Sequence, residues 1–85
     1  MTKFEPDKIL AYAAALDGDI GVQVVRVVED QRVRRYYMGT VYGVGVATDR
    51  GHKFDLYADA LLTAREFVKQ CADIVAARAI TKEQT

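Results

Sequence analysis

Cysteine, proline, histidine and tryptophan are almost missing from this sequence: its 85 residues include one Cys, one Pro, one His and no Trp. The single cysteine, Cys71, cannot form an internal disulfide, so we expect the chain to work in a reducing compartment, the cytoplasm. The N-terminal residues MTKFEPDK contain no apolar run after their charges, so no signal peptide is expected. No stretch reaches the roughly 18 apolar residues that a membrane span requires.

Net charge is also absent, because 12 basic and 12 acidic residues cancel. The protein as a whole therefore has no field that would draw it to nucleic acid or to an acidic membrane. The balance is uneven, however. Residues 1–19 carry −2 (two basic, four acidic), residues 20–54 carry +3 (six basic, three acidic) and residues 55–85 carry −1 (four basic, five acidic). The middle of the chain is thus its basic part.

The length allows one domain, residues 1–85, and the last five residues, TKEQT, are expected to form a flexible tail. A first helix is predicted over residues 6–16, since Pro6 suits the first helical position and Asp17-Gly18 supplies a stop. Its apolar face would comprise Ile9, Leu10, Ala13 and Leu16.

A second, longer helix is predicted from the N-cap Asp55 to about Ala79. Its apolar stripe would comprise Tyr57, Leu61, Ala64, Phe67, Val68, Cys71, Ile74 and Val75. Its polar face would carry Asp59, Thr63, Glu66, Gln70 and Asp73. Roughly 24 helical residues span about 36 Å, more than so small a core. The C-terminal turns are therefore predicted to protrude or to meet a partner, and a homodimer through this helix is one prediction.

The segment between the helices is rich in β-branched residues. The run IGVQVVRVV, residues 20–28, predicts a strand that either is buried on both faces at one end or carries a bulge. Residues 29–32 predict a hairpin turn. Strand character then persists to Thr48, and a division near Gly39 would give strands 32–38 and 41–48. The alternative is one long strand bent at Gly39 and Gly43, followed by a short strand near residues 53–56.

Together these elements predict an α+β fold: a short antiparallel three-stranded sheet with two helices on one face, in the order α-β-β-β-α. Glycines of the segment YYMGTVYGVGVATDRGH, residues 36–52, are accounted for by strand alternation. The face that holds Gly39, Gly43 and Gly45 is nearly bare, which would let the alanine-rich first helix come close or simply bend the strand. The alternative is a flat face that receives an external partner. A turn is predicted at residues 48–51.

No catalytic, cofactor or metal signature is found in the sequence. The segment GVGVATDRGH matches neither the dinucleotide pattern nor the Walker A loop, because a threonine and a histidine stand where glycine and lysine are needed. His52 has no second histidine or cysteine at metal-ligand spacing. Cys71 lies on an apolar stripe, where cysteine acts as a small hydrophobe. The chain is therefore predicted not to be an enzyme and to use no cofactor.

One cluster points to binding: the segment RVRRYY, residues 32–37, with Arg26 before it. Arginine and tyrosine are enriched at the energetic centres of protein interfaces. The predicted partner-binding residues are Arg26, Arg32, Arg34, Arg35, Tyr36 and Tyr37. A solvated hairpin, a protein-contact face and a nucleic-acid face, with arginine on phosphates and tyrosine on bases, are the three interpretations of this cluster.

The order α-β-β-β-α resembles the double-stranded-RNA-binding fold, which reads RNA partly through lysines at the start of its second helix. Here Asp55 and Asp59 stand in that region, so the resemblance extends to element order alone. In size and architecture, the chain also resembles the small phage-encoded inhibitors of bacterial defence, such as anti-CRISPR proteins. That resemblance implies a non-catalytic module that occludes the surface of a partner protein. Nucleic-acid binding through the same arginine-tyrosine residues is the alternative.

Overall fold

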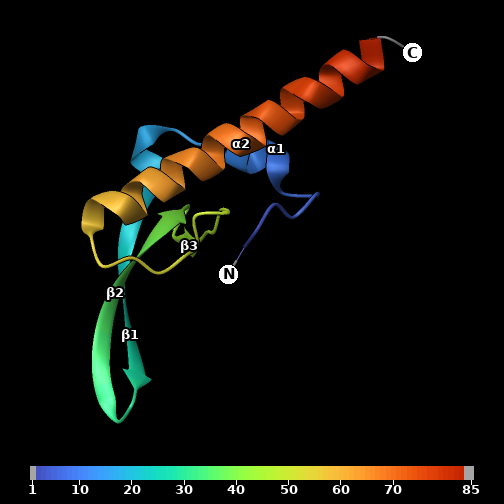
Figure 1. Ribbon diagram of the computed structural model, residues 1–85. Helices are drawn as coiled ribbons and strands as arrows, with labels where there is room; N and C mark the ends of the chain where they lie inside the picture. The colour runs from blue at the N-terminus through green and yellow to red at the C-terminus, as the bar shows by residue number, and fades with distance from the viewer. Residues whose placement is uncertain (1, 84–85) are drawn as a thin grey trace.

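A three-stranded antiparallel sheet and two helices make up the computed structural model, which describes the backbone of residues 2–83 and side chains up to residue 79. The predicted α+β class and the order of elements are confirmed. Along the chain, the elements are α1 (Ile9–Ala13), a 3-10 turn (Asp17–Asp19), β1 (Ile20–Glu29), β2 (Arg32–Val41), β3 (Val44–Gly45) and α2 (Tyr57–Glu83) (Figure 1).

β1 and β2 form a long hairpin, as the β-branched run and the polar turn predict. Their pairing runs without interruption from Ile20 opposite Val41 to Glu29 opposite Arg32, so this pair contains no bulge. The turn between them places Asp30 and Gln31 at φ 51° and 64°. Two successive residues with positive φ match the right-handed twist of the flanking strands.

The end of β2 differs from the prediction. β2 continues through Gly39 to Val41, and the chain reverses at Tyr42 and Gly43, which both have positive φ. The division expected near Gly39 is therefore wrong, and β3 is only two residues long. The alternative strand near residues 53–56 is present in part, because Phe54 forms an antiparallel bridge with Tyr37 through backbone hydrogen bonds of 2.8 and 2.9 Å.

Gly39 is the place where α2 crosses the sheet. A Cβ atom at this position would collide with the Ala60 carbonyl oxygen and would lie 3.0 Å from the Ala64 Cβ. The bare strand position therefore accommodates α2, and the expected close approach of the first helix is wrong. Close contact of this kind needs glycine on the strand and small residues on the helix.

α1 is shorter than predicted. It spans five residues, and Pro6 lies in a turn before it. Leu10 and Leu16, expected on its apolar face, are exposed, whereas Tyr12 is buried with Ile9. A helix this short cannot present both Ile9 and Leu16 to one core, because the chain leaves helical geometry after Ala14. Asp19 closes the following turn by accepting the Leu16 backbone N–H at 2.9 Å.

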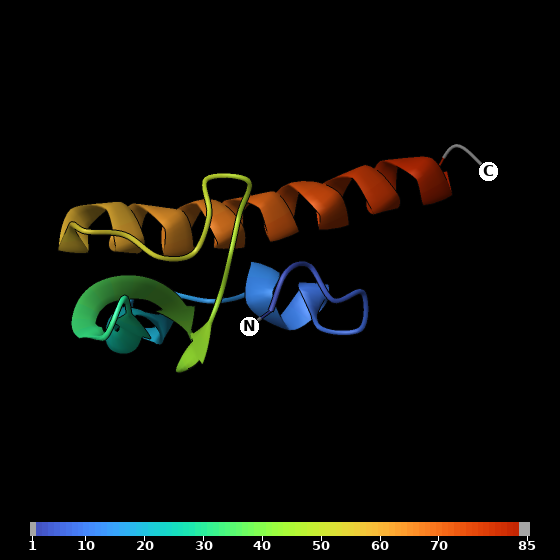
Figure 2. The same ribbon diagram turned by 60° about the horizontal axis from the view of Figure 1, so that its bottom comes forward.

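The core lies where α1, α2 and the base of the sheet meet. Phe67 is fully buried at its centre, stacked on Phe4 at 4.9 Å and edge-on to Tyr12 at 5.1 Å. Val41 and Val46 close it from the sheet side, and Cys71 is buried beside them. In Figure 2, α2 forms one layer, while the sheet and α1 lie side by side beneath it. α2 therefore covers the sheet, and α1 packs mainly against α2.

α2 begins at Tyr57, one residue after the start that an N-cap at Asp55 implies, so Asp55 does not directly precede it. It ends at Glu83, which makes residues 81–83, expected in a flexible tail, helical; residues 84 and 85 lie outside the described part. Thr63, predicted on the polar face, is fully buried. The buried residues of α2 include Ala60, Thr63, Ala64 and Phe67. Compared with the predicted apolar stripe, the face of α2 that contacts the sheet is therefore rotated toward the small residues that approach Gly39.

The molecule is elongated, with principal extents of 56 × 25 × 18 Å. Its radius of gyration is 14.8 Å, against about 12 Å for a compact domain of this length. Figure 1 shows why: the C-terminal half of α2 extends beyond the core at one end, and the distal half of the β1–β2 hairpin extends away from α2. Within residues 2–83, neither helix combines the length and apolar character needed to cross a bilayer.

Candidate contact surface on the hairpin

The six predicted partner-binding residues lie on two opposite faces of the hairpin. Residues paired directly across antiparallel strands point to the same side, and successive residues point to opposite sides. One side, here called the arginine face, carries Val24, Arg26, Val28, Val33, Arg35 and Tyr37. The other, here called the Tyr36 face, carries Val25, Val27, Glu29, Arg32, Arg34 and Tyr36. The hairpin therefore does not present all six residues to one partner.

The Tyr36 face is held together by contacts within the chain. The Tyr36 hydroxyl donates a hydrogen bond of 2.9 Å to Glu29 Oε2, and Arg34 lies 3.6 Å from the same oxygen. Arg34 and Lys53 place their charges 5.5 and 5.4 Å from the centre of the Tyr36 ring, within the roughly 6 Å range of cation–π attraction. This tyrosine is accordingly occupied by its own neighbours.

The same contacts alter the acidity of Tyr36. Its hydrogen bond to Glu29 raises the pKa of the phenol, and partial desolvation acts in the same direction, while the charge of Arg34 opposes both. The hydroxyl therefore remains a proton donor at neutral pH. The network therefore does not favour the phenolate form of Tyr36, which is the form that could act as a nucleophile.

The arginine face has the opposite character, since its charges are unpaired. Arg26 lies directly opposite Arg35 across the two strands. Neither guanidinium makes an ion pair, hydrogen bond or cation–π contact with the side chains that the structure describes. Like charges directly opposite each other destabilise a strand pair. The fold alone therefore gives no reason for this arrangement.

Backbone bonding shows that the two arginines form a close pair. Tyr37 directs both its N–H and its C=O to Phe54, away from β1. Alternation along the strand then makes Arg35 opposite Arg26 a pair without mutual hydrogen bonds. In such pairs the Cα atoms are about 4.5 Å apart and the side chains are closer than in hydrogen-bonded pairs. An anion placed between the two guanidinium groups could be contacted by both.

Exposed apolar side chains surround this pair. Val28 and Val33, opposite each other toward the turn, are 73% and 66% exposed, and Val24 on the other side is 52% exposed. Tyr37 meets Tyr57 edge-on at 5.9 Å, and Tyr57 is itself 55% exposed. The apolar surface therefore continues from the hairpin onto the start of α2.

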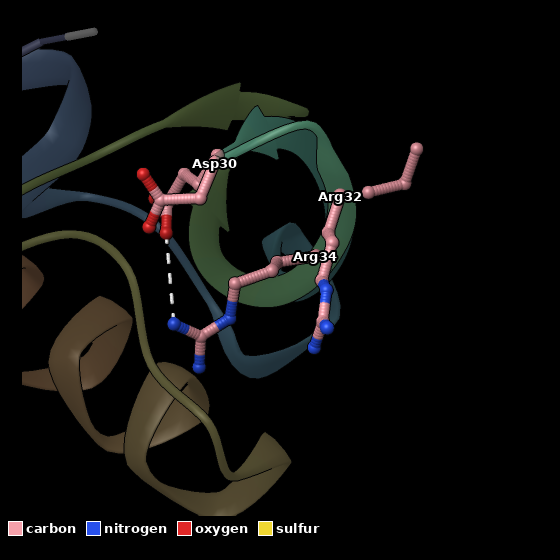
Figure 3. A pocket seen from close by; sticks show the side chains of 5 residues that line it. Asp30, Arg32 and Arg34 are labelled. Atoms are coloured by element: carbon pink, nitrogen blue, oxygen red, sulfur yellow. Dashed lines mark ion pairs between the residues drawn. The ribbon is translucent and has the colours of Figure 1, made fainter.

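A hollow of ≈ 630 Å³ lies at the tip of the hairpin, lined by Glu29, Asp30, Arg32, Val33 and Arg34. Figure 3 shows Arg34 reaching toward the acidic side chains of this end, with the ion pair dashed, while Arg32 ends apart from it. The hollow is open, and two of its four charged side chains, Arg34 and Glu29, are paired with each other. It offers no enclosed space for a small ligand.

Other reactive groups are dispersed. Cys71 is buried in the core, and burial raises the pKa of its thiol, which disfavours the nucleophilic thiolate. In the part of the chain that the structure describes, no three His, Cys, Asp or Glu side chains are grouped to hold a metal ion. The predicted arginines and tyrosines thus remain the main candidates for function.

Sequence reasoning missed the valines of the arginine face. The valine-rich run at residues 20–28 predicts a strand that is buried on both faces at one end or carries a bulge, and Val33 is predicted only as the start of the next strand. The available signal was their spacing: Val24, Arg26 and Val28 alternate on one face, and an arginine in the middle of a strand indicates that this face is exposed.

Comparison with family models, with curated proteins and with solved structures finds no match to this chain.

Proposed function

We propose that this protein is a non-catalytic protein-binding module whose arginine face docks on an acidic surface of a partner protein. The observation that carries the proposal is the unpaired Arg26–Arg35 pair, set among three exposed valines on a hairpin that extends beyond the core. A partner carboxylate between the guanidinium groups would relieve their repulsion and gain charge-assisted hydrogen bonds.

The surrounding side chains support docking of a protein. Val24, Val28, Val33 and Tyr57 together expose apolar surface next to directional donors, and an apolar centre with arginine and aromatic residues is typical of protein interfaces. Contiguous exposed apolar surface of this kind marks interaction sites in soluble proteins. The remaining predicted residues, Arg32, Arg34 and Tyr36, lie on the opposite face and would contact only a partner that wraps around the hairpin.

Occlusion of a partner surface, as small phage-encoded inhibitors achieve, is the form of binding that we propose. A projecting two-stranded ribbon can enter a cleft that the rest of the molecule cannot reach, and the absence of catalytic groups from the arginine face leaves binding as its action. Because the chain is neutral overall, the proposed recognition depends on local charge on the hairpin and not on a field of the whole protein.

The test is capture of partners by the immobilised full-length protein from nuclease-treated bacterial lysate, read by mass spectrometry. The test variant carries Arg26→Glu and Arg35→Glu. The matched control carries Arg65→Glu and Lys69→Glu, the same change of charge on exposed positions of α2. We expect a protein partner that the control retains and the test variant loses.

Two results would contradict the proposal. If both variants retain the same partner as the unmodified protein, the arginine face is not the contact surface. If a partner captured from untreated lysate is absent after nuclease treatment, the hairpin arginines Arg26, Arg32 and Arg35 act on phosphates, and the nucleic-acid alternative replaces the proposal. Binding of that kind would weaken steeply as salt rises.

A homodimer through α2 is a separate proposal. A groove of ≈ 340 Å³ beside its C-terminal half is lined by Leu10, Val75, Arg78 and Ala79 and is mainly apolar. Sedimentation at two concentrations measures the oligomeric state: a mass that stays at 9.5 kDa would refute the dimer.

A further inference from the structure

The outer edge of β1 is an open strand edge. The sheet order is β1-β2-β3, so β1 has a neighbour on one side only. The edge is ten residues long, its pairing with β2 contains no bulge, and it contains no proline. Bulges, prolines and short length are the usual devices that prevent strand addition at an edge. β1 has none of them, and its one mid-strand charge is Arg26.

The bonding pattern identifies which backbone groups are free. Tyr37 bonds to Phe54 on the side away from β1, so its partner Val24 directs its own N–H and C=O away from β2. By alternation the same holds for Ile20, Val22, Arg26 and Val28. No backbone hydrogen bond to these outward groups from Val22 to Val28 is made by residues 2–83. The edge therefore presents a regular row of unpaired donors and acceptors.

The residues with outward backbone groups are also those whose side chains form the arginine face. Val24, Arg26 and Val28 follow one another on this face. Val24 and Val28 are 52% and 73% exposed, and Arg26 between them is charged. A strand added beside β1 would align its own alternate side chains with these three. Affinity from the backbone and selectivity from the side chains would thus come from one site, as in recognition by strand addition.

Resting on the proposed function, we infer that the partner contributes an extended segment that pairs with the outer edge of β1 and carries an acidic residue beside Arg26. Its residues two positions before and after the acidic one are apolar and lie beside Val24 and Val28. The pattern is apolar-x-acidic-x-apolar. It follows from strand alternation for either direction of the added strand.

A second copy of this chain is the less suitable occupant. Pairing of β1 with β1 of another copy would bring two more arginines toward an existing pair that already lacks a counter-charge. Such a dimer would place four guanidinium groups along one face, and like charges across strands are destabilising. An acidic segment instead neutralises the pair.

The test uses the full chain, labelled with ¹⁵N, and the peptide KTVTETVTK, which has the inferred pattern. We expect the amide signals of Val22, Val24, Arg26 and Val28 to shift and to become protected from hydrogen exchange. Exchanging the central Glu for Lys should weaken binding about tenfold, which corresponds to ~1.4 kcal/mol. The peptide KTVETTVTK, of identical composition with the Glu on the other face, should weaken it similarly.

Two variants distinguish binding to the backbone of the β1 edge from binding to the side chains of the arginine face. Val24→Pro removes an outward N–H without breaking a bond to β2, and edge positions of this kind tolerate proline. Val24→Ala truncates the same side chain but keeps the N–H. Val24→Pro should abolish peptide binding, whereas Val24→Ala should reduce it only a few-fold. Arg26→Glu should reverse the preference, so that the Lys-centred peptide binds better than the Glu-centred one.

The inference is overturned if about 1 mM peptide leaves the β1 amides unshifted in the correctly folded protein, or if Val24→Pro binds as Val24→Ala does. Failure of the proposed function gives a different result, because the partner captured from lysate is then retained by Arg26→Glu with Arg35→Glu. A partner that Arg26→Glu with Arg35→Glu loses but Val24→Pro retains would leave the arginine face in place and remove the strand edge. A spectrum of Val24→Pro without the peptide verifies that the variant is folded.

Discussion

Gly39→Ala should separate α2 from the sheet. The new Cβ would overlap the Ala60 carbonyl oxygen and lie 3.0 Å from both the Cβ and the backbone N of Ala64. Two of these three atoms belong to the helix backbone, so no change of rotamer can relieve the contact. The helix would have to retreat by about 1 Å, and a gap of that size removes a quarter to a half of each dispersion contact.

The magnitude follows from what α2 buries at this crossing. Ala60, Thr63, Ala64 and Phe67 are all fully buried, so a rigid shift loosens several contacts at once. Overpacking of this kind destabilises by about 3 kcal/mol. For a domain of this size, that is a decrease in Tm of roughly 12–24 °C and a large part of a total stability of about 4–13 kcal/mol.

Gly45→Ala is the matched control. Its Cβ would lie 2.6 Å from Met38 Sδ, a flexible side chain near the surface that can move aside. Urea unfolding followed by circular dichroism measures both variants under the same conditions. If Gly39→Ala is as stable as Gly45→Ala within about 0.5 kcal/mol, the account of α2 resting on a bare strand position is wrong.

Three further variants probe the turn, the core and the surface. Gln31→Gly should raise the stability by about 1 kcal/mol, measured by urea unfolding, because Gln31 has a left-handed φ of 64°. Thr63→Val should raise it by about 1 kcal/mol in the same assay, since the buried Thr63 Oγ1 has no partner among the described residues; a decrease would indicate a hidden hydrogen bond. Arg50 lowers the pKa of Glu66 below its usual 4.5 through paired hydrogen bonds of 2.9 and 3.2 Å. The ion pair thus stabilises above that usual value and is lost as the pH falls through the lowered one, so Glu66→Gln should decrease Tm at neutral pH but not at about pH 2.

The hairpin could be predicted from the sequence because its signals are local. The β-branched run, the polar residues 29–32 and the alternation of side chains all depend on near neighbours, and the structure has the strands and the turn in these places. The unbroken register excludes the bulge that adjacent valines suggested. The adjacent valines lie on opposite faces of the hairpin, where Val24 and Val28 are exposed and Val25 and Val27 are half-buried.

The position of the second turn could not be predicted, because two glycines mark it equally well. Gly39 is required by contact with α2, and Gly43 by a positive φ of 75°. Only tertiary packing distinguishes these causes. Tyr42 is an unusual residue for its positive φ of 54°, and it is held there by a hydroxyl hydrogen bond to the Ala11 carbonyl and by its contact with Tyr12. No local sequence pattern predicts a turn that is stabilised by such distant contacts.

The candidate site was predictable in its residue types and not in its geometry. Arg26, Arg35 and Tyr37 share a face with the valines, whereas Arg34 and Tyr36 lie on the other face in contacts of their own. Separating the two groups requires the register. The alternation of Val24 and Val28 with Arg26 indicates an exposed face, but how far that face extends depends on α2 covering only the base of the sheet, where Gly39 lets the helix cross.

The Arg26–Arg35 pair suggests that stability and binding oppose each other on the hairpin. Arg26→Glu would convert a repulsive cross-strand pair into an attractive one, so the free protein should become more stable, with a Tm increase of a few °C. The same variant should lose an acidic partner. Both properties are measurable on one sample, by thermal unfolding and by titration with the Glu-centred peptide. A residue that weakens the fold yet is needed for binding is what a functional surface predicts. A decrease in Tm would instead show that Arg26 stabilises the hairpin, and the argument from its unpaired charge would fail.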